Sequence, residues 1–269
     1  RGGSMTNRLK QRLDEGSAAI GIQLRFGSPA IAEMAGLAGF DWLLLDAEHS
    51  PQTAPGIQTQ LQAIGCTDST AIVRLGRGDP DQIRLYLDMG AMGIAVPFIS
   101  TAEEARACAD ACRYPPRGTR GWGPHRAGGY GLHAERYTAR IDDEVLFFPI
   151  IETATAIENI DAIMAVDGVD SCIVGPVDLC YSLGIPFQFD HPDFLSALDR
   201  VRDASNKAGK PSGLPLLGSV EDRANVDRQV VAGARLLLVG CDEPALGNAF
   251  TSMLEPLSHL QDQQRQRPE

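Results

Sequence analysis

The sequence predicts a single-domain α/β protein of the (β/α)8 class, a TIM barrel, and three observations lead to that class. Eight apolar runs of strand length alternate with runs of helical periodicity, which implies parallel pairing. The length of 269 residues fits one barrel. Acidic residues end several different strands, where barrel enzymes carry their chemistry. An open doubly wound sheet is the alternative, but the regular repeat and the spread of the acids favour closure.

Strands are expected at the apolar runs, in chain order at residues 19–25, 42–47, 71–75, 93–97, 145–151, 171–175, 212–217 and 235–240. Helices are expected at the periodic runs that follow them, at residues 29–38, 55–64, 80–89, 101–112, 154–165, 193–208, 220–232 and 243–256. Each strand is therefore followed by a helix, which is the repeat of a barrel.

Local signals mark where several of these helices begin and end. Asp79 before Pro80 has the pattern of an N-cap followed by proline at the first helical position. Thr101 and Glu104 have the spacing of a capping box. Glycines stand where helices should stop, at positions 39, 90, 168, 209 and 233.

One connection, residues 113–144, is long and rich in glycine and proline. Loops of this length inside a compact domain are usually functional or disordered. Because it comes after the fourth strand, we expect it to lie over the catalytic face and to shape a pocket or a subunit contact. His125 lies in this connection and could reach the pocket.

The charge balance argues against two classes of partner. The chain has 24 basic and 35 acidic residues and a formal net charge of −11, whereas nucleic acids and anionic membranes are bound by clustered lysine and arginine. No apolar run reaches the about 20 residues that cross a bilayer. We therefore expect neither a nucleic-acid partner nor a membrane-spanning segment.

The six cysteines are spread over the chain without the dense spacing of a secreted disulfide scaffold. No apolar signal segment precedes them, so a reducing, cytoplasmic setting is expected. Cys108 and Cys112 could face one ligand on a helix, but no further cysteine or histidine pair completes a zinc site. Buried thiols are the favoured interpretation.

The expected barrel domain covers residues 5–260. Residues 1–4, before Met5, are interpreted as the remnant of an expression tag. Residues 261–269 form a polar tail without apolar periodicity. Both ends are left out of the fold prediction.

Three apolar runs lead into acidic residues that could meet in one site. The second strand runs into Asp46, Glu48 and His49. The fifth strand ends at Glu152, and the sixth is followed by Asp178. Two carboxylates with open positions suit a hard divalent cation. Glu152 and Asp178 are therefore candidate ligands for Mg²⁺ or Mn²⁺, with waters or a bidentate 2-oxo acid completing the octahedron.

Neighbouring residues supply the other groups that enolate chemistry needs. His49 is the candidate base, because an imidazole that titrates near neutrality can remove a proton beside a polarised ketone. Arg74, at the end of the third strand, can donate to the enolate oxygen. Asp46 and Glu48 are expected to hold water molecules around the metal. Taken singly, each residue could be a helix cap, a surface ion pair or a structural histidine, and their convergence indicates function.

These residues resemble the HpcH/HpaI aldolases, the class II pyruvate aldolase family that includes 4-hydroxy-2-oxoheptanedioate aldolase and macrophomate synthase. The resemblance covers nearly the whole expected domain. It is carried by residues 39–42 with 46–49, 73–74 with 79–80, 113–118 with 120–121, 151–153 and 175–179.

The resemblance implies a role for each strand-end residue. Glu152 and Asp178 would bind the metal, and His49 would be the acid–base group. Arg74 would contact pyruvate and stabilise the enolate oxygen. Asp88 would match the family aspartate that raises the basicity of the histidine.

The resemblance also implies the remaining substrate contacts and an oligomer. The backbone amides of Val177 and Asp178, beside Gly175, would hold the pyruvate carboxylate. The cofactor would be Mg²⁺ or Mn²⁺, with Co²⁺ as a further candidate. The enzyme would be a homo-oligomer, in this family typically a hexamer, whose sites are completed by neighbouring subunits.

The sequence departs from the family pattern two residues before the metal-binding glutamate. Family members commonly carry a glutamine there that touches substrate, and this chain has Ile150. The residues at the positions expected to face the aldehyde are also particular to this chain, namely Gln23, Trp122, His125 and Leu216. The natural aldehyde, the stereochemistry and the pathway are therefore left open.

The expected function is that of a carbon–carbon lyase, a metal-dependent aldolase that adds pyruvate enolate to an aldehyde and cleaves the 4-hydroxy-2-oxo acid in reverse. An oxaloacetate decarboxylase or a CoA-ester lyase using the same site is the alternative, although the sequence shows no basic cluster for CoA phosphates. A Schiff-base aldolase is disfavoured because Lys10, Lys207 and Lys210 fall on expected helices or loops. A non-catalytic binding barrel is the other alternative, and the intact strand-end set argues against it.

Overall fold

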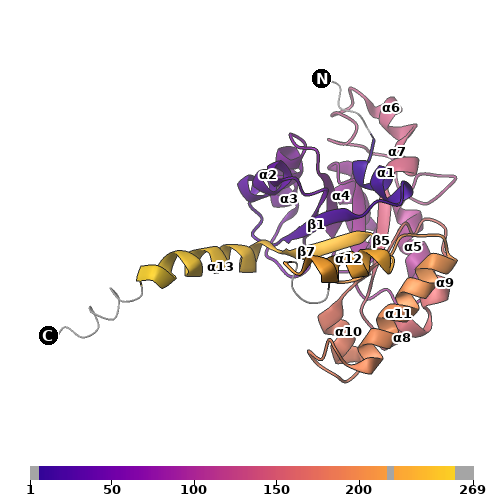
Figure 1. Cartoon of the computed structure of the whole chain (residues 1–269). Helices are drawn as coiled ribbons and strands as arrows, with labels where there is room; N and C mark the ends of the chain where they lie inside the picture. Colours follow the sequence, from indigo (N-terminus) through magenta and orange to yellow (C-terminus); the bar gives the residue numbers. More distant parts are fainter. Residues whose placement is uncertain (1–5, 217–220, 258–269) are drawn as a thin grey trace.

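The computed structural model describes residues 6–216 and 221–257 of the chain (Figure 1). Its strands form one parallel sheet in the order β6-β5-β4-β3-β2-β1-β7, curved into a nearly closed barrel, so the predicted fold class is confirmed. The strands are β1 (Ala19–Leu24), β2 (Trp42–Asp46), β3 (Thr70–Arg74), β4 (Gly93–Val96), β5 (Leu146–Ile151), β6 (Ile173–Val174) and β7 (Leu236–Cys241). The expected tag remnant and polar tail lie outside the described residues.

The segment between β6 and β7 nearly closes the barrel without forming a regular strand. The last residue of β6 donates its N–H to Gly213 O (3.1 Å), and Ser212 forms an isolated parallel bridge with Ala234. The strand expected at 212–217 is therefore wrong over its described part, because Pro215 has no N–H to donate to a sheet. Its last residue lies outside the described chain.

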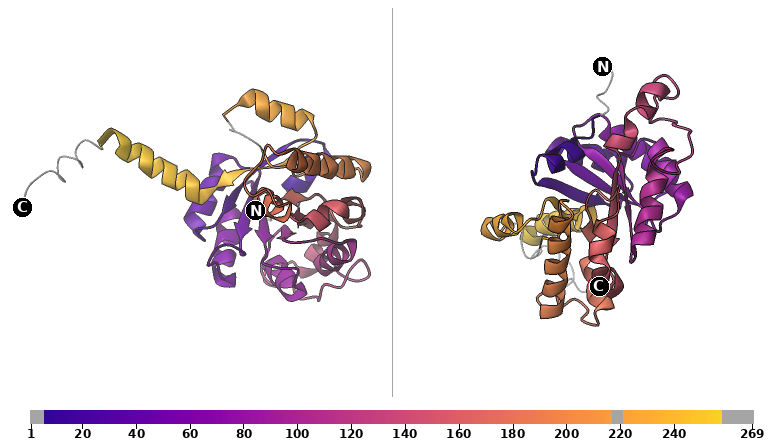
Figure 2. Two further views of the ribbon diagram at one scale, coloured as in Figure 1. Left: turned by 90° about the horizontal axis from the view of Figure 1, so that it is seen from below. Right: turned by 90° about the vertical axis from the view of Figure 1, so that its right-hand side faces the viewer.

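Helices cover the outside of the sheet (Figures 1 and 2). Most of those that the periodicity predicts are present, namely α2 (Pro29–Ala38), α3 (Ala54–Ile64), α4 (Pro80–Asp88), α5 (Ala102–Cys112), α11 (Pro192–Lys207), α12 (Arg223–Val231) and α13 (Asp242–Leu254). The helix expected at 154–165 is divided at Asn159 into α8 (Ala154–Glu158) and α9 (Ile160–Met164). The periodicity does not predict the short helices α1 (Arg8–Asp14), α6 (Ala134–Thr138), α7 (Ile141–Glu144), α10 (Pro176–Ser182) and η1 (Glu255–Leu257).

Two predicted helix caps are confirmed. The Asp79 side chain accepts a hydrogen bond from Asp81 N–H, and Pro80 occupies the first helical position of α4. Thr101 and Glu104 form both hydrogen bonds of a capping box at the start of α5. These caps satisfy amide groups that a helix start leaves without partners.

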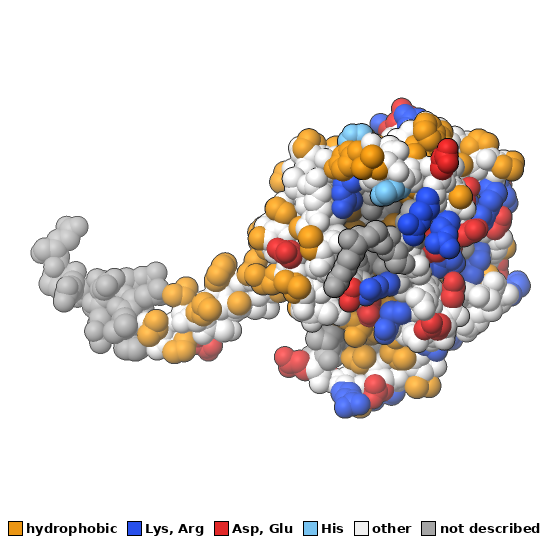
Figure 3. Space-filling model, turned by 90° about the horizontal axis from the view of Figure 1, so that it is seen from above, with side chains coloured by type: hydrophobic (Ala, Val, Ile, Leu, Met, Phe, Trp, Pro, Cys, Tyr) orange, Lys and Arg blue, Asp and Glu red, His pale blue; other side chains and the backbone are white. Residues whose placement is uncertain are grey.

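Helix α13 extends away from the barrel in Figure 1 and in the left view of Figure 2. Phe250 and Met253 on this helix are 60% and 71% exposed. Figure 3 shows hydrophobic side chains along the extended helix, whereas acidic and basic side chains are interspersed over the barrel. The helix therefore presents apolar surface that the single chain does not cover.

The barrel interior is lined by apolar side chains and is closed at its amino end. Trp42 and Phe148 are fully buried in an interior cluster that also includes Leu9 and Leu13 of α1. The N–H of Leu9 donates to Thr70 Oγ1 (3.2 Å) at the first residue of β3. Because α1 closes the amino end, the strand ends that are accessible are the carboxyl ends.

The long connection 113–144 lies at the amino end of the barrel, so its expected place over the catalytic face is wrong. Arg126 donates to Leu61 O in the last turn of α3 (3.0 Å) and to Met89 O just after α4 (3.0 Å). Helix ends of this kind lie at the amino face, because each helix runs back against its strand. The connection follows α5 rather than β4, and Figure 1 shows α6 and α7 beside α1.

Among the described residues, no helix is long and apolar enough to cross a membrane. All six cysteines lie in the described part of the chain and are free thiols. Burial raises the pKa of the Cys108 and Cys112 thiols to about 12. Both are therefore protonated, buried groups, as the sequence interpretation has them.

Gly21→Ala is expected to lower the free energy of unfolding by about 1–3 kcal/mol, because overpacking forces a buried neighbour to move. A Cβ atom at this position would lie 2.2 Å from Trp42 Cε2. Gly76→Ala is the matched control, since its Cβ would meet nothing within 4 Å. Urea denaturation measures both variants, and equal stabilities would contradict the tight packing of Trp42.

Candidate active site

A pocket of about 310 Å³ opens at the carboxyl ends of the strands. His49, Arg74, Glu152 and Asp178 all line it, and so do Gly175 and Val177. These side chains come from the turn after β2, the end of β3, the end of β5 and the first turn of α10. Barrel topology therefore brings together residues that are as many as 129 positions apart, from 49 to 178.

Asp46 shapes the turn that carries two of the predicted site residues. Its Oδ1 accepts hydrogen bonds from the backbone N–H groups of Glu48 (2.8 Å) and His49 (3.0 Å). Its Oδ2 accepts one from Gln23 Nε2 (2.5 Å). The Asp46 side chain is fully buried and does not line the pocket. Its carboxylate therefore fixes the direction in which the turn presents His49.

Glu48 lies between the arginine and the histidine of the site. Its Oε2 forms an ion pair with Arg74 Nη2, and the two side chains are only 10% and 12% exposed. His49 Nε2 lies 3.5 Å from the same oxygen, with a side chain that is 52% exposed. Burial raises the pKa of Glu48, and the positive charge of Arg74 opposes that shift. The carboxylate thus links a buried cation to an imidazole that is open to the pocket.

Glu152 is buried at the end of β5, with 1% of its surface exposed. Its Oε1 accepts a hydrogen bond from Phe98 N–H (2.8 Å), whereas Oε2 is buried without a hydrogen-bond partner. Burial raises the pKa of Glu152 to about 7; the Phe98 amide and Arg74 oppose the shift, and the charge of Asp178 adds to it. A buried carboxylate in this state is unusual outside functional sites.

A glycine makes room for this carboxylate. A Cβ atom on Gly175 would lie 2.4 Å from Glu152 Oε2. Gly175 is also the N-cap residue of α10, whose first helical residue is Pro176 and whose first turn contains Asp178. The short helix therefore starts beside Glu152 and holds the second acid on the wall of the same pocket.

The residues fit a divalent cation. A buried carboxylate oxygen without a partner is stabilised by a nearby positive charge. Glu152 and Asp178 supply two carboxylates. The described chain contains no larger group, of three or more His, Cys, Asp or Glu side chains, that could hold a metal. Mg²⁺ suits such a set, because it keeps several waters and is often bound through one or two carboxylates.

Asp88 does not belong to this pocket within one chain. It is the last residue of α4, where helix ends lie at the amino face. Its Oδ1 accepts a hydrogen bond from Arg120 Nη2 (2.6 Å), and the Arg120 guanidinium lies over the Tyr114 ring, 4.6 Å from its centroid. The expected partnership of Asp88 with His49 is therefore not formed inside a single chain.

The four positions expected to face the aldehyde divide into two pairs. Gln23 lines the pocket of about 310 Å³ at the carboxyl ends of the strands, called the catalytic pocket below. Leu216 lines a second cavity beside it. Trp122 and His125 belong to the connection at the amino end and line neither cavity of the same chain. Trp122 Nε1 donates instead to Thr138 Oγ1 (3.0 Å).

Two residues escape the sequence reasoning, one that contacts Glu152 and one that lines the pocket. Phe98, which donates to Glu152, has a φ of +56°, a strained conformation for a residue other than glycine. No sequence pattern marks it. Arg25 lines the pocket and donates through Nη2 to His49 O (2.5 Å). It stands directly after β1, so the strand-end rule that selects Arg74 also applies to it.

The chain matches the family model described as HpcH/HpaI aldolase/citrate lyase over residues 20–248. It is 41% identical over 255 residues to a 4-hydroxy-2-oxovalerate aldolase from Rhodococcus jostii, covering 93% of this chain and 95% of that one. It is 38% identical over 249 residues to a hydroxypyruvate/pyruvate aldolase from Roseobacter denitrificans, covering 92% and 95%. The crystal structure of an HpcH/HpaI aldolase/citrate lyase family protein from Burkholderia cenocepacia, 32% identical, superposes with a TM-score of 0.86, covering 94% and 100%.

Glu152→Gln is expected to stabilise the metal-free protein at pH 8 and to change its stability little at pH 5. The pKa of Glu152 in the folded protein, about 7, lies above its ordinary value of 4.5. Protonation therefore favours folding, and its contribution is complete below pH 4.5 and lost as the pH rises through 7. The difference is at most about 3 kcal/mol.

Thermal unfolding in the presence of a chelator at the two pH values measures this effect. Glu158→Gln, on the exposed side of α8, controls for the chemical change itself. A gain in Tm for Glu152→Gln that is the same at both pH values would contradict the strained, buried state of the carboxylate.

Proposed function

The chain belongs to the HpcH/HpaI aldolase/citrate lyase family, and we propose that it adds the enolate of pyruvate to an aldehyde with the help of a divalent metal. It is a carbon–carbon lyase of the aldolase type. In the reverse direction it would cleave a 4-hydroxy-2-oxo acid between C3 and C4. The observation that carries the proposal is the buried, unpartnered Glu152 oxygen in a pocket shared with His49 and Asp178.

Glu152 and Asp178 would hold the metal, which is Mg²⁺ or Mn²⁺ in this proposal, with Co²⁺ as a further candidate. When bound, the cation polarises the 2-oxo group and favours loss of a proton from C3. Because Glu152 must be ionised to bind it, the metal competes with a proton whose pKa is about 7. Metal affinity is therefore expected to fall as the pH drops below 7.

His49 would move the proton. Its half-exposed ring lines the pocket, and both its backbone N–H and its C=O are held, by Asp46 and Arg25 respectively. In the aldol direction it would take a proton from C3 of pyruvate. After the bond between C3 and the aldehyde carbon forms, it would give a proton to the aldehyde oxygen. One proton leaves carbon and one reaches oxygen, so the step is balanced.

Arg74 would donate to the enolate oxygen. Its Nη2 is paired with Glu48, whereas its Nε is buried without a hydrogen-bond partner. A buried donor without a partner is costly unless a ligand uses it. The negative charge that develops on the 2-oxo group as C3 loses its proton supplies such an acceptor.

Pyruvate itself would be oriented by its carboxylate. The amides of Val177 and Asp178 lie in the first turn of α10, where helix amides have no partner within the helix. Ile150 lines the pocket two residues before Glu152. Its side chain can contact the substrate but cannot hydrogen-bond to it, so orientation would rest on the amides, on Arg74 and on the metal.

A homo-oligomer, hexameric in line with the sequence resemblance, would complete the site. Asp88 lies at the amino face and could act on His49 only from a neighbouring chain. The apolar residues that α13 exposes, among them Phe250 and Met253, would be covered in such an assembly. The oligomeric state can be measured directly by light scattering.

In D₂O, metal-loaded protein is expected to exchange the methyl protons of pyruvate, and chelator-treated protein is not. His49→Ala should slow exchange by about 100-fold to 10,000-fold, the usual contribution of a general base, while Mn²⁺ still binds in titration calorimetry. Asp178→Ala, in contrast, should lose Mn²⁺ binding itself. Proton NMR follows the exchange.

The control is His191→Asn, which keeps a side chain able to cap α11 and should exchange at the wild-type rate. The reverse pattern, in which His49→Ala loses the metal and Asp178→Ala keeps it, would contradict the assigned roles.

A further inference from the structure

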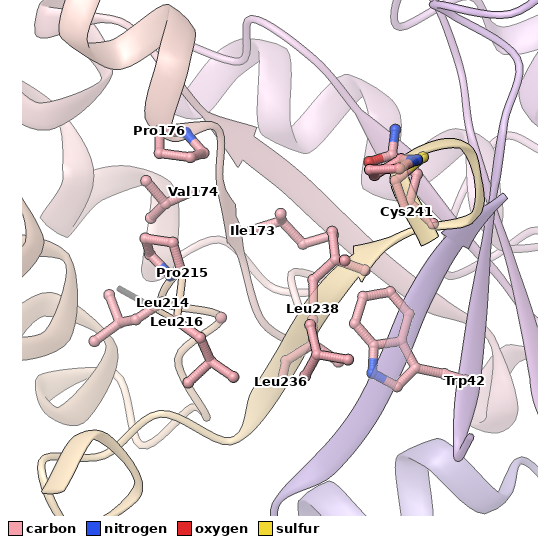
Figure 4. A pocket seen from close by; sticks show the side chains of 15 residues that line it. Trp42, Ile173, Val174, Pro176, Leu214, Pro215, Leu216, Leu236, Leu238 and Cys241 are labelled. Atoms are coloured by element: carbon pink, nitrogen blue, oxygen red, sulfur yellow. The ribbon is translucent and has the colours of Figure 1, made fainter. Parts of the chain in front are cut away.

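A second cavity, of about 430 Å³, adjoins the catalytic pocket in the gap between β6 and β7 (Figure 4). The two cavities have six lining residues in common: Gln23, Ile173, Val174, Pro176, Leu238 and Cys241. Trp42 and Leu236 line one part of the second cavity, and the segment that carries Leu214 and Leu216 lines another. We call this second cavity the apolar chamber.

The apolar chamber carries no charge at neutral pH. None of its 15 described lining residues is Asp, Glu, Lys, Arg or His. Burial raises the pKa of the Cys241 thiol to about 11, so the thiol is neutral. Gln23, at the boundary with the catalytic pocket, already donates its amide to Asp46. A charged group that entered the chamber would lose its hydration without gaining a partner.

Each of the two arginines that line the catalytic pocket already has an acidic partner. Arg25 pairs with Glu243 Oε2 (2.6 Å) and donates to His49 O. Arg74 pairs with Glu48. An anionic substituent would therefore find no arginine of the catalytic pocket that is without an acidic partner.

We propose that the apolar chamber takes the substituent of the acceptor aldehyde and that the preferred acceptors are neutral aldehydes with an alkyl or aromatic group. This inference rests on the proposed aldol function. In that reaction C3 of pyruvate bonds to the aldehyde carbon in the catalytic pocket, so the substituent must extend into adjoining space. Because an apolar cavity of about 150 Å³ already accepts benzene, the chamber is large enough for a six-carbon chain.

The test compares acceptors of graded length and charge with Mn²⁺-loaded enzyme and pyruvate. From acetaldehyde to butanal to hexanal, kcat/KM should rise by about threefold to fourfold per methylene, the gain from burying one CH₂ group. Butanal should exceed 4-oxobutanoate, which has the same number of carbons and one negative charge, by at least about tenfold. Mass spectrometry of the product acids gives the rates.

A positive charge placed in the chamber should weaken the preference for apolar acceptors. Leu216→Arg is expected to lower the ratio of hexanal to 4-oxobutanoate kcat/KM by at least about tenfold, because it offers a cation to the anionic acceptor. The ratio is internal to each variant, so loss of folded enzyme does not change it. Leu195→Arg, which places the same charge on α11 away from both cavities, should keep the wild-type ratio.

Methyl-proton exchange of pyruvate needs no aldehyde, so it tests enolate formation separately from the acceptor preference. Exchange by the wild-type enzyme without a rise in rate from acetaldehyde to hexanal, or with 4-oxobutanoate as good as butanal, would overturn the inference alone. Exchange with an unchanged ratio in Leu216→Arg would do the same. Absence of exchange would overturn the proposed function and the inference with it.

Discussion

The site depends on one unfavourable burial, that of the Glu152 carboxylate at the end of β5. One of its oxygens is satisfied by a residue in a strained conformation, Phe98, and the other has no partner. A glycine at position 175 is needed for the carboxylate to fit at all. Such costs cluster at functional sites. A cation bound between Glu152 and Asp178 would offset them.

The remaining charges of the site are arranged around this carboxylate by the register of the parallel sheet. Asp46 and Arg74 are paired positions on β2 and β3, which brings the turn after β2 beside the arginine. Glu48 in that turn neutralises Arg74 and approaches the His49 ring. The proposed acid–base group and the candidate donor to the enolate oxygen therefore both lie beside the same carboxylate.

Much of the site could be predicted because barrel topology turns a local pattern into a place in space. An apolar run that ends at an acid predicts both the strand and the face that the acid occupies, which holds for Glu152. The position of residues 113–144 was not predictable from their length alone, since α5 carries the chain back to the amino face before they begin. The positive φ of Phe98 and the loss of strand structure at Pro215 depend on backbone torsions and pairing that no periodicity encodes.

Anomalous diffraction from crystals soaked in Mn²⁺ would test whether Glu152 and Asp178 form the proposed metal site. We expect a peak in the catalytic pocket with one carboxylate oxygen from each of these two residues as its protein ligands. A peak elsewhere in the chain, with none beside Glu152, would contradict it.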